Sequence, residues 1–207
     1  MIRVEPDKLI RQPRQSRSIR TKEKILDAAY NLFCQKGYYK TTTNEIAKTA
    51  NVSIGSLYSY FKDKDTILLE ILDRYNASFV QVNDDLNLDM DQYREDPKMW
   101  FRRFIEGMVE THKKSKEFNQ EMQVLSHSMP AVAAILEKQR GKTLERALTY
   151  LTEYRDILRV QDLEAASIVS TNIIGSTVDQ IVFSDNQIED ARILNAGVDA
   201  LCQYLIG

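Results

Sequence analysis

Apolar residues recur along most of this chain at the three-to-four-residue spacing of an amphipathic α-helix. Between positions 18 and 36 this pattern is carried by Ile25, Ala28, Ala29, Leu32 and Phe33, and a glycine follows at position 37, where a helix would stop. Strand signals are few. The pattern predicts further helices over about 64–82, 97–116, 117–126, 130–154, 162–183 and 188–206. With two short helices between 42 and 61, this is an all-α fold of about nine helices.

The two short helices have recognisable start signals. Thr42 and Glu45 fit a capping box, which predicts a helix running to about Ala50. Asn51 follows, and asparagine accepts the left-handed backbone conformation that a tight turn needs. Ser53 can then cap a second short helix over about 54–61. Two short capped helices joined by a tight turn are a helix-turn-helix.

Charge is distributed unevenly along the chain. The 207 residues carry a formal net charge of only -2, which by itself argues against a nucleic-acid partner. However, residues 1–66 hold 13 Lys and Arg against 7 Asp and Glu, whereas residues 67–207 hold 15 against 23. The basic excess therefore lies on the helix-turn-helix and on an arm over 1–17, which is either a solvated tail or a phosphate-seeking segment.

Composition also narrows the chemistry. Cys34 and Cys202 form neither a disulfide framework nor a metal motif, and His112 and His127 have no ligand set at metal-binding spacing. We therefore expect no metal site and no cofactor. GxSxG and phosphate-loop patterns are absent, so catalytic residues and an enzyme are not expected. No signal peptide or membrane-spanning stretch is recognised, which favours a cytoplasmic protein that does not enter membranes.

A helix that enters the DNA major groove needs small or polar side chains at its start, so that its backbone can approach the bases. The second short helix offers such side chains at Ile54, Gly55, Ser56, Ser59 and Tyr60. Hydroxyl and amino groups at the groove rim suit phosphate contacts. The candidates for that role are Thr42, Thr43, Ser53, Tyr58, Lys62 and Lys64. The alternative for Tyr58 and Tyr60 is packing alone.

These residues resemble the N-terminal domain of the TetR family of bacterial regulators. The similarity covers about 19–68, including Ile46-Ala47, Val52-Ser53, Gly55, Leu57-Tyr58 and Tyr60-Phe61, and departs from the family's usual turn glycine at Asn51. The resemblance implies phosphate contacts by Thr42, Tyr58 and Lys64, and an approach to the bases by residues 54, 55, 56 and 60. It also implies a DNA-binding domain over 18–66 and a ligand-binding and dimerisation domain over 67–207.

In the second domain the sequence is less informative. A cavity between the middle helices would be lined by aromatic, sulfur-containing and polar side chains, most of which could equally be ordinary core. The candidates are Trp100, Phe104, Met108, His112, Phe118, Met122, Leu125, Met129, Tyr150 and Asn172. The last two helices are the expected dimer interface, with an intramolecular core as the alternative. The residues expected there are Ile174, Val178, Ile181, Leu194, Val198, Leu201 and Leu205.

Together with the resemblance, these features predict a regulator that binds a palindromic DNA operator as a homodimer. The resemblance implies a repressor, with an activator as the alternative. A small effector of unknown identity, hydrophobic or amphipathic, would release it. The alternative is a helical protein-interaction scaffold without effector binding.

Overall fold

The computed structural model describes residues 16–87 and 94–207, and within them the regular structure is helical. The helices are α1 (Ser16–Lys36), α2 (Thr43–Thr49), α3 (Ile54–Tyr60), α4 (Lys64–Asn87), α6 (Pro97–Lys114), α7 (Lys116–Ser126), α8 (Pro130–Glu153), the 3-10 helix η1 (Arg155–Ile157), α9 (Leu163–Phe183) and α10 (Asp190–Leu205). The all-α prediction is confirmed, with nine α-helices bounded in the described ranges. Most of the expected arm, up to residue 15, lies outside those ranges.

The chain divides into two compact units, residues 1–74 and 75–207, and it passes from one to the other within α4. The boundary that the resemblance implies is at residue 66. The difference has a local cause, because the first three turns of α4 pack on the first unit through buried Ile67, Leu68 and Leu72. Two ion pairs, Lys22–Glu70 at 2.7 Å and Arg74–Glu23 at 2.5 Å, further tie that part of α4 to α1.

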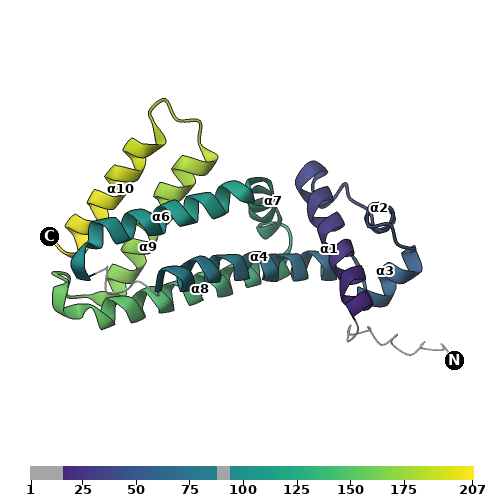
Figure 1. Ribbon diagram of the computed structural model, residues 1–207, viewed down its shortest axis with the longest axis horizontal. Helices are drawn as coiled ribbons and strands as arrows, with labels where there is room; N and C mark the ends of the chain where they lie inside the picture. The colour runs from purple at the N-terminus through teal and green to yellow at the C-terminus, as the bar shows by residue number, and fades with distance from the viewer. Residues whose placement is uncertain (1–15, 88–93) are drawn as a thin grey trace. The chain divides into compact units, whose positions relative to one another are not determined.

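In the first unit α1, α2 and α3 pack around one small core (Figure 1). Ile25, Phe33, Ile46, Leu57 and Phe61 are each almost completely buried. These side chains come from all three helices, and from the residue just after α3. Burial of several large apolar side chains in so few residues holds the short α2 and α3, which would be unstable alone.

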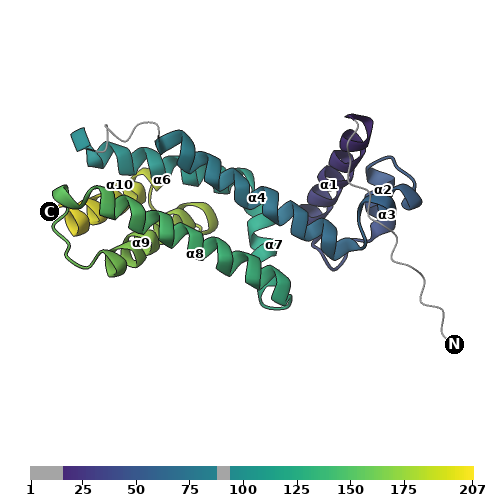
Figure 2. The same cartoon turned by 90° about the horizontal axis from the view of Figure 1, so that it is seen from below.

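The second unit is built on α6, α9 and α10. Figure 1 shows α9 and α10 as a helical hairpin with α6 beside them, and α6 packs on both. Figure 2 shows α8 running alongside α9, and α7 packs on α8. The hairpin is close-packed where Gly197 faces Thr177, because a side chain at 197 would overlap the threonine hydroxyl. Among the helices of the described ranges, none combines the length and hydropathy that a membrane span requires.

Candidate nucleic-acid interface and ligand cavity

The turn between α2 and α3 is held by local caps. The Thr42 hydroxyl accepts a hydrogen bond from the Glu45 backbone N–H at 3.3 Å, and the Glu45 carboxylate accepts one from the Thr42 N–H at 2.9 Å. Ser53 Oγ accepts from the Ser56 N–H at 3.0 Å and so caps α3. Asn51 has a φ of 54°, the left-handed conformation expected of the turn residue. The predicted helix-turn-helix is therefore confirmed.

Most of the predicted DNA-contacting side chains lie on the outside of this motif. Ile54 is 39% exposed and Tyr58 48% exposed. The Tyr58 hydroxyl and Thr43 Oγ1 are 3.0 Å apart, which links α3 to α2 at the surface. A Cβ on Gly55 would meet no atom within 4 Å, so packing inside the chain does not require a glycine there. Its small size leaves room for close approach by a partner. Thr42, Ser53, Ser59 and Lys62 are exposed, and Ser56 is half-buried.

Two of the predicted DNA-contacting side chains, Tyr60 and Lys64, form contacts inside the fold instead. Tyr60 is only 8% exposed, and its hydroxyl lies 2.9 Å from Ser18 Oγ on α1. The Lys64 ammonium donates to the carbonyl oxygens of Tyr38 and Thr41, both at 2.8 Å, and lies 4.0 Å from the centre of the Tyr38 ring. Burial lowers the pKa of Lys64. Tyr60 therefore has little surface for a base contact, and Lys64 supports the turn whether or not it reaches phosphate.

Further polar contacts brace the same unit. Lys36 Nζ lies 2.5 Å from a Glu45 carboxylate oxygen. That hydrogen bond, followed by those from Thr42, lowers the pKa of Glu45 to about 2. Tyr38 donates to Asp65, and burial, then this bond, raises the pKa of the tyrosine. These pairs join residues that are far apart in the sequence, so no local sequence pattern predicts them.

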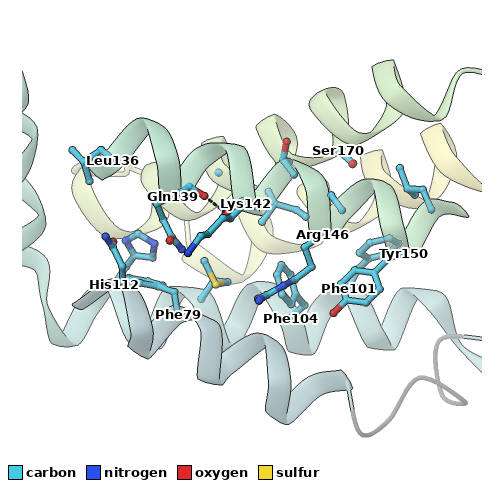
Figure 3. Close-up of a pocket in the computed structure, with 18 of the residues that line it drawn as sticks. Phe79, Phe101, Phe104, His112, Leu136, Gln139, Lys142, Arg146, Tyr150 and Ser170 are labelled. Atoms are coloured by element: carbon cyan, nitrogen blue, oxygen red, sulfur yellow. Dashed lines mark hydrogen bonds between the residues drawn. The ribbon is translucent and has the colours of Figure 1, made fainter. Parts of the chain in front are cut away.

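The second unit encloses a cavity of about 480 Å³, within the ~300–1,000 Å³ typical of small-molecule sites (Figure 3). Six of the ten predicted effector residues line it. They are Trp100, Phe104, Met108, His112, Met122 and Tyr150. The other four do not line it. Phe118 and Leu125 are fully buried in the core, Met129 precedes α8, and Asn172 is exposed on α9.

Polar side chains line the cavity from α4, α6, α7, α8 and α9. At one end His112 Nδ1 lies 2.9 Å from Asn119 Nδ2, which also donates to the Tyr75 hydroxyl at 2.8 Å. Burial lowers the pKa of His112 and favours its neutral form. On α8 the side chains of Gln139, Lys142 and Arg146 line the cavity. Sequence reasoning missed these three, although they share the helical face of Tyr150 at three-to-four-residue intervals.

The residues expected at the dimer interface lie inside the single chain. Val178, Ile181, Leu194, Val198, Leu201 and Leu205 are buried within the single chain, and Ile174 lines the cavity. They form the core between α6, α9 and α10, which is the alternative that sequence reasoning had left open. Their side chains are already covered, so a second copy would have to use other positions. On α9 the exposed large apolar residues are Ile168, at 45%, and Val169, at 38%.

Comparison with known proteins adds two family matches. Residues 25–71 match the model of bacterial regulatory proteins of the tetR family. Residues 77–206 match the model of the tetracyclin repressor-like C-terminal domain. The two matched segments coincide closely with the helix-turn-helix unit and the cavity unit.

Individual relatives agree with these matches. The uncharacterized HTH-type transcriptional regulator YerO of Bacillus subtilis is 28% identical over 84% of this chain and 61% of its own length. The HTH-type transcriptional regulator QacR of Staphylococcus aureus is 51% identical over 51 residues, 25% of this chain and 27% of QacR. The chain thus spans less than two thirds of these relatives. SmeT, the repressor of the Stenotrophomonas maltophilia multidrug efflux pump SmeDEF, shares the fold, with a TM-score of 0.68 at 21% identity over 91% of this chain and 93% of SmeT.

Proposed function

This chain belongs to the TetR family of transcriptional regulators, and from that premise we propose that it is a ligand-released repressor acting in the cytoplasm. Members of the family are regulators and not enzymes. A homodimer binds a palindromic operator through α2 and α3 of each copy. A small molecule in the cavity of the second unit lowers the affinity for that operator.

The observation that carries the DNA-binding part is the outer face of α3. Small and polar groups, with open space where a side chain at Gly55 would stand, leave the start of the helix open to a major groove. Tyr58, held by Thr43 of α2, stands beside it as a phosphate contact. The excess of Lys and Arg over Asp and Glu in residues 1–66 also favours this part of the chain as the one that docks on DNA.

Coupling between the two units is supported by α4. Residues up to Arg74 belong to the first unit, whereas Tyr75 and Phe79 of the same helix line the cavity. A ligand that favours one position of this helix must bind the operator-bound and free proteins with different affinities. Operator DNA then lowers ligand affinity by the same factor.

The homodimer is supported by the exposed apolar side chains Ile168 and Val169 on α9. Pairing of two copies across a two-fold axis would cover them and place two α3 helices on half-sites ~34–36 Å apart. Light scattering should give twice the chain mass for the wild type, and Ile168→Glu with Val169→Glu should give monomers that bind inverted repeats poorly.

The DNA-binding proposal is tested by fluorescence anisotropy on a duplex selected from random-sequence DNA. Gly55→Ala should retain the fold and lose operator affinity, because its methyl group points into open space that DNA would occupy. Lys62→Ala should reduce the slope of log affinity against log salt by about 1 per subunit. Lys138→Ala, with the same charge change at an exposed position of α8, is the control. Unchanged binding by Gly55→Ala and Lys62→Ala would contradict the assigned face.

A further inference from the structure

The wall that α8 gives the cavity carries two cationic side chains, Lys142 and Arg146. They are four residues apart, so they lie one above the other on the same helical face. Figure 3 shows both reaching from α8 toward the aromatic side chains across the cavity. Like charges at this spacing repel each other and destabilise the helix. The pair therefore destabilises α8 locally, and an anion lying between the two groups would remove this repulsion.

Neither cation is neutralised by any residue that the structure describes. Within the described residues, Lys142 and Arg146 make no ion pair, and none of the described residues that line the cavity is Asp or Glu. Other cations of the same unit do have carboxylate partners. Examples are Arg94–Asp156 at 2.7 Å, Lys98–Asp199 at 2.5 Å and Lys113–Asp190 at 3.1 Å. Residues 67–207 carry an acidic excess, so a wall whose described residues include cations and no acid differs from the average charge of this part of the chain.

The rest of the cavity is suited to an apolar body. Trp100 and Phe104 stack with their centres 5.4 Å apart and their planes within 4°. Phe79, Phe101 and Tyr150 extend this aromatic lining. Aromatic faces alone would also accept an organic cation. Two fixed positive charges in the same space repel such a ligand and attract one of opposite sign.

We propose that the cavity binds amphipathic organic carboxylates. Their hydrophobic body lies against Trp100 and Phe104, and their carboxylate is held by Lys142 and Arg146. The guanidinium group can donate two parallel hydrogen bonds to a carboxylate, and the ammonium adds a third donor. This inference rests on the proposed function only in taking the cavity as the effector site.

The chain has one tryptophan, and it lines the cavity, so its fluorescence reports binding directly in the full-length protein. Three probes with the same alkyl chain but different head charge separate the possibilities: decanoate, decanamide and decyltrimethylammonium. Decanoate should bind at least ~10-fold more tightly than the other two.

The variant Lys142→Met with Arg146→Met should weaken decanoate binding about 10–100-fold and change decanamide binding less than about twofold. Lys138→Met with Arg140→Met is the matched control. It removes the same charge from exposed positions of the same helix outside the cavity, and should leave all three affinities unchanged. The single variant Lys142→Gln, at an exposed position, preserves the test if the double variant folds poorly.

The outcomes separate this proposal from the proposed function. Decanoate that binds as expected but leaves the operator complex intact would contradict ligand release and uphold the carboxylate site. Equal or tighter binding of decanamide or decyltrimethylammonium would overturn the carboxylate site, as would a cationic wall whose removal has no effect. A cavity that binds none of the three probes would overturn it as well. Operator affinity without ligand is measured separately and decides the DNA-binding proposal.

Discussion

The cations near α2 and α3 and the cations on the α8 wall of the cavity differ in whether the fold provides their partners. In the first unit Lys64 donates to two carbonyl oxygens and Lys36 pairs with Glu45. In the second unit Lys142 and Arg146 line an aromatic cavity without an ion-pair partner among the described residues. A surface that must match a rigid duplex benefits from being preformed. A site that binds a small ion benefits from charged groups that are not already paired within the protein.

If the first unit presents a preformed surface, the loss of a core side chain should have the largest effect on its stability. Leu57→Ala removes a side chain that is fully buried between α3 and its neighbours, and should lower the free energy of unfolding by about 2–5 kcal/mol. Urea denaturation followed by circular dichroism measures this loss. Tyr58→Ala, at the exposed next position, should cost far less stability while it weakens operator binding. Equal losses in the two variants would show that α3 is not packed as described.

In the second unit the equivalent test is the contact of α10 with α9. Gly197→Ala places a methyl group against the Thr177 hydroxyl, which is held by the Ile173 carbonyl at 2.7 Å. Because overpacking outweighs the gain in helix propensity, we expect a net loss of about 1–2 kcal/mol in the same measurement. Gly141→Ala on α8 faces open space and should stabilise by about 0.5–1 kcal/mol. Stabilisation by both variants would refute the close packing.

Lys64 provides a further test of the comparison, because its ammonium group is hydrogen-bonded to backbone carbonyl oxygens of the same unit. Lys64→Ala removes two hydrogen bonds to partly buried carbonyl oxygens and should lower the free energy of unfolding by about 1 kcal/mol. Its operator affinity should also fall, partly through the disturbed turn. Lys62→Ala, exposed and two residues away, should lose affinity without losing stability. A Lys64→Ala protein as stable as the wild type would contradict the bracing role.

The smallest effect concerns Glu45. Its folded-state pKa of about 2 lies below the usual 4.5, so its contribution to stability is complete above about pH 4.5 and is lost as pH falls toward 2. Glu45→Gln, which does not titrate, should show a shallower loss of stability between pH 5 and pH 2 than the wild type. Urea midpoints at several pH values would reveal this, and parallel curves would argue against the pairing with Lys36.

Local signals explain what the sequence could predict. The caps at Thr42 and Ser53 and the turn at Asn51 each depend on residues within three or four positions, so they were found together with the helix-turn-helix. Contacts between helices were not accessible in this way. The carbonyl partners of Lys64, the burial of Tyr60 and the cavity position of Arg146 depend on how separate helices pack. The apolar width of α9 and α10 indicated burial without telling whether their own chain or a second copy supplies the cover.

The division of labour between the two units is tested most directly by hydrogen–deuterium exchange of the full-length protein with a selected operator duplex. The account predicts that the duplex slows exchange in peptides covering residues 42–62, with the largest change at the exposed start of α3. Peptides covering the cavity wall of α8 should show no comparable protection. Protection of α8 by DNA with unchanged exchange over 42–62 would contradict the account, because DNA would then bind the unit that we assign to the ligand.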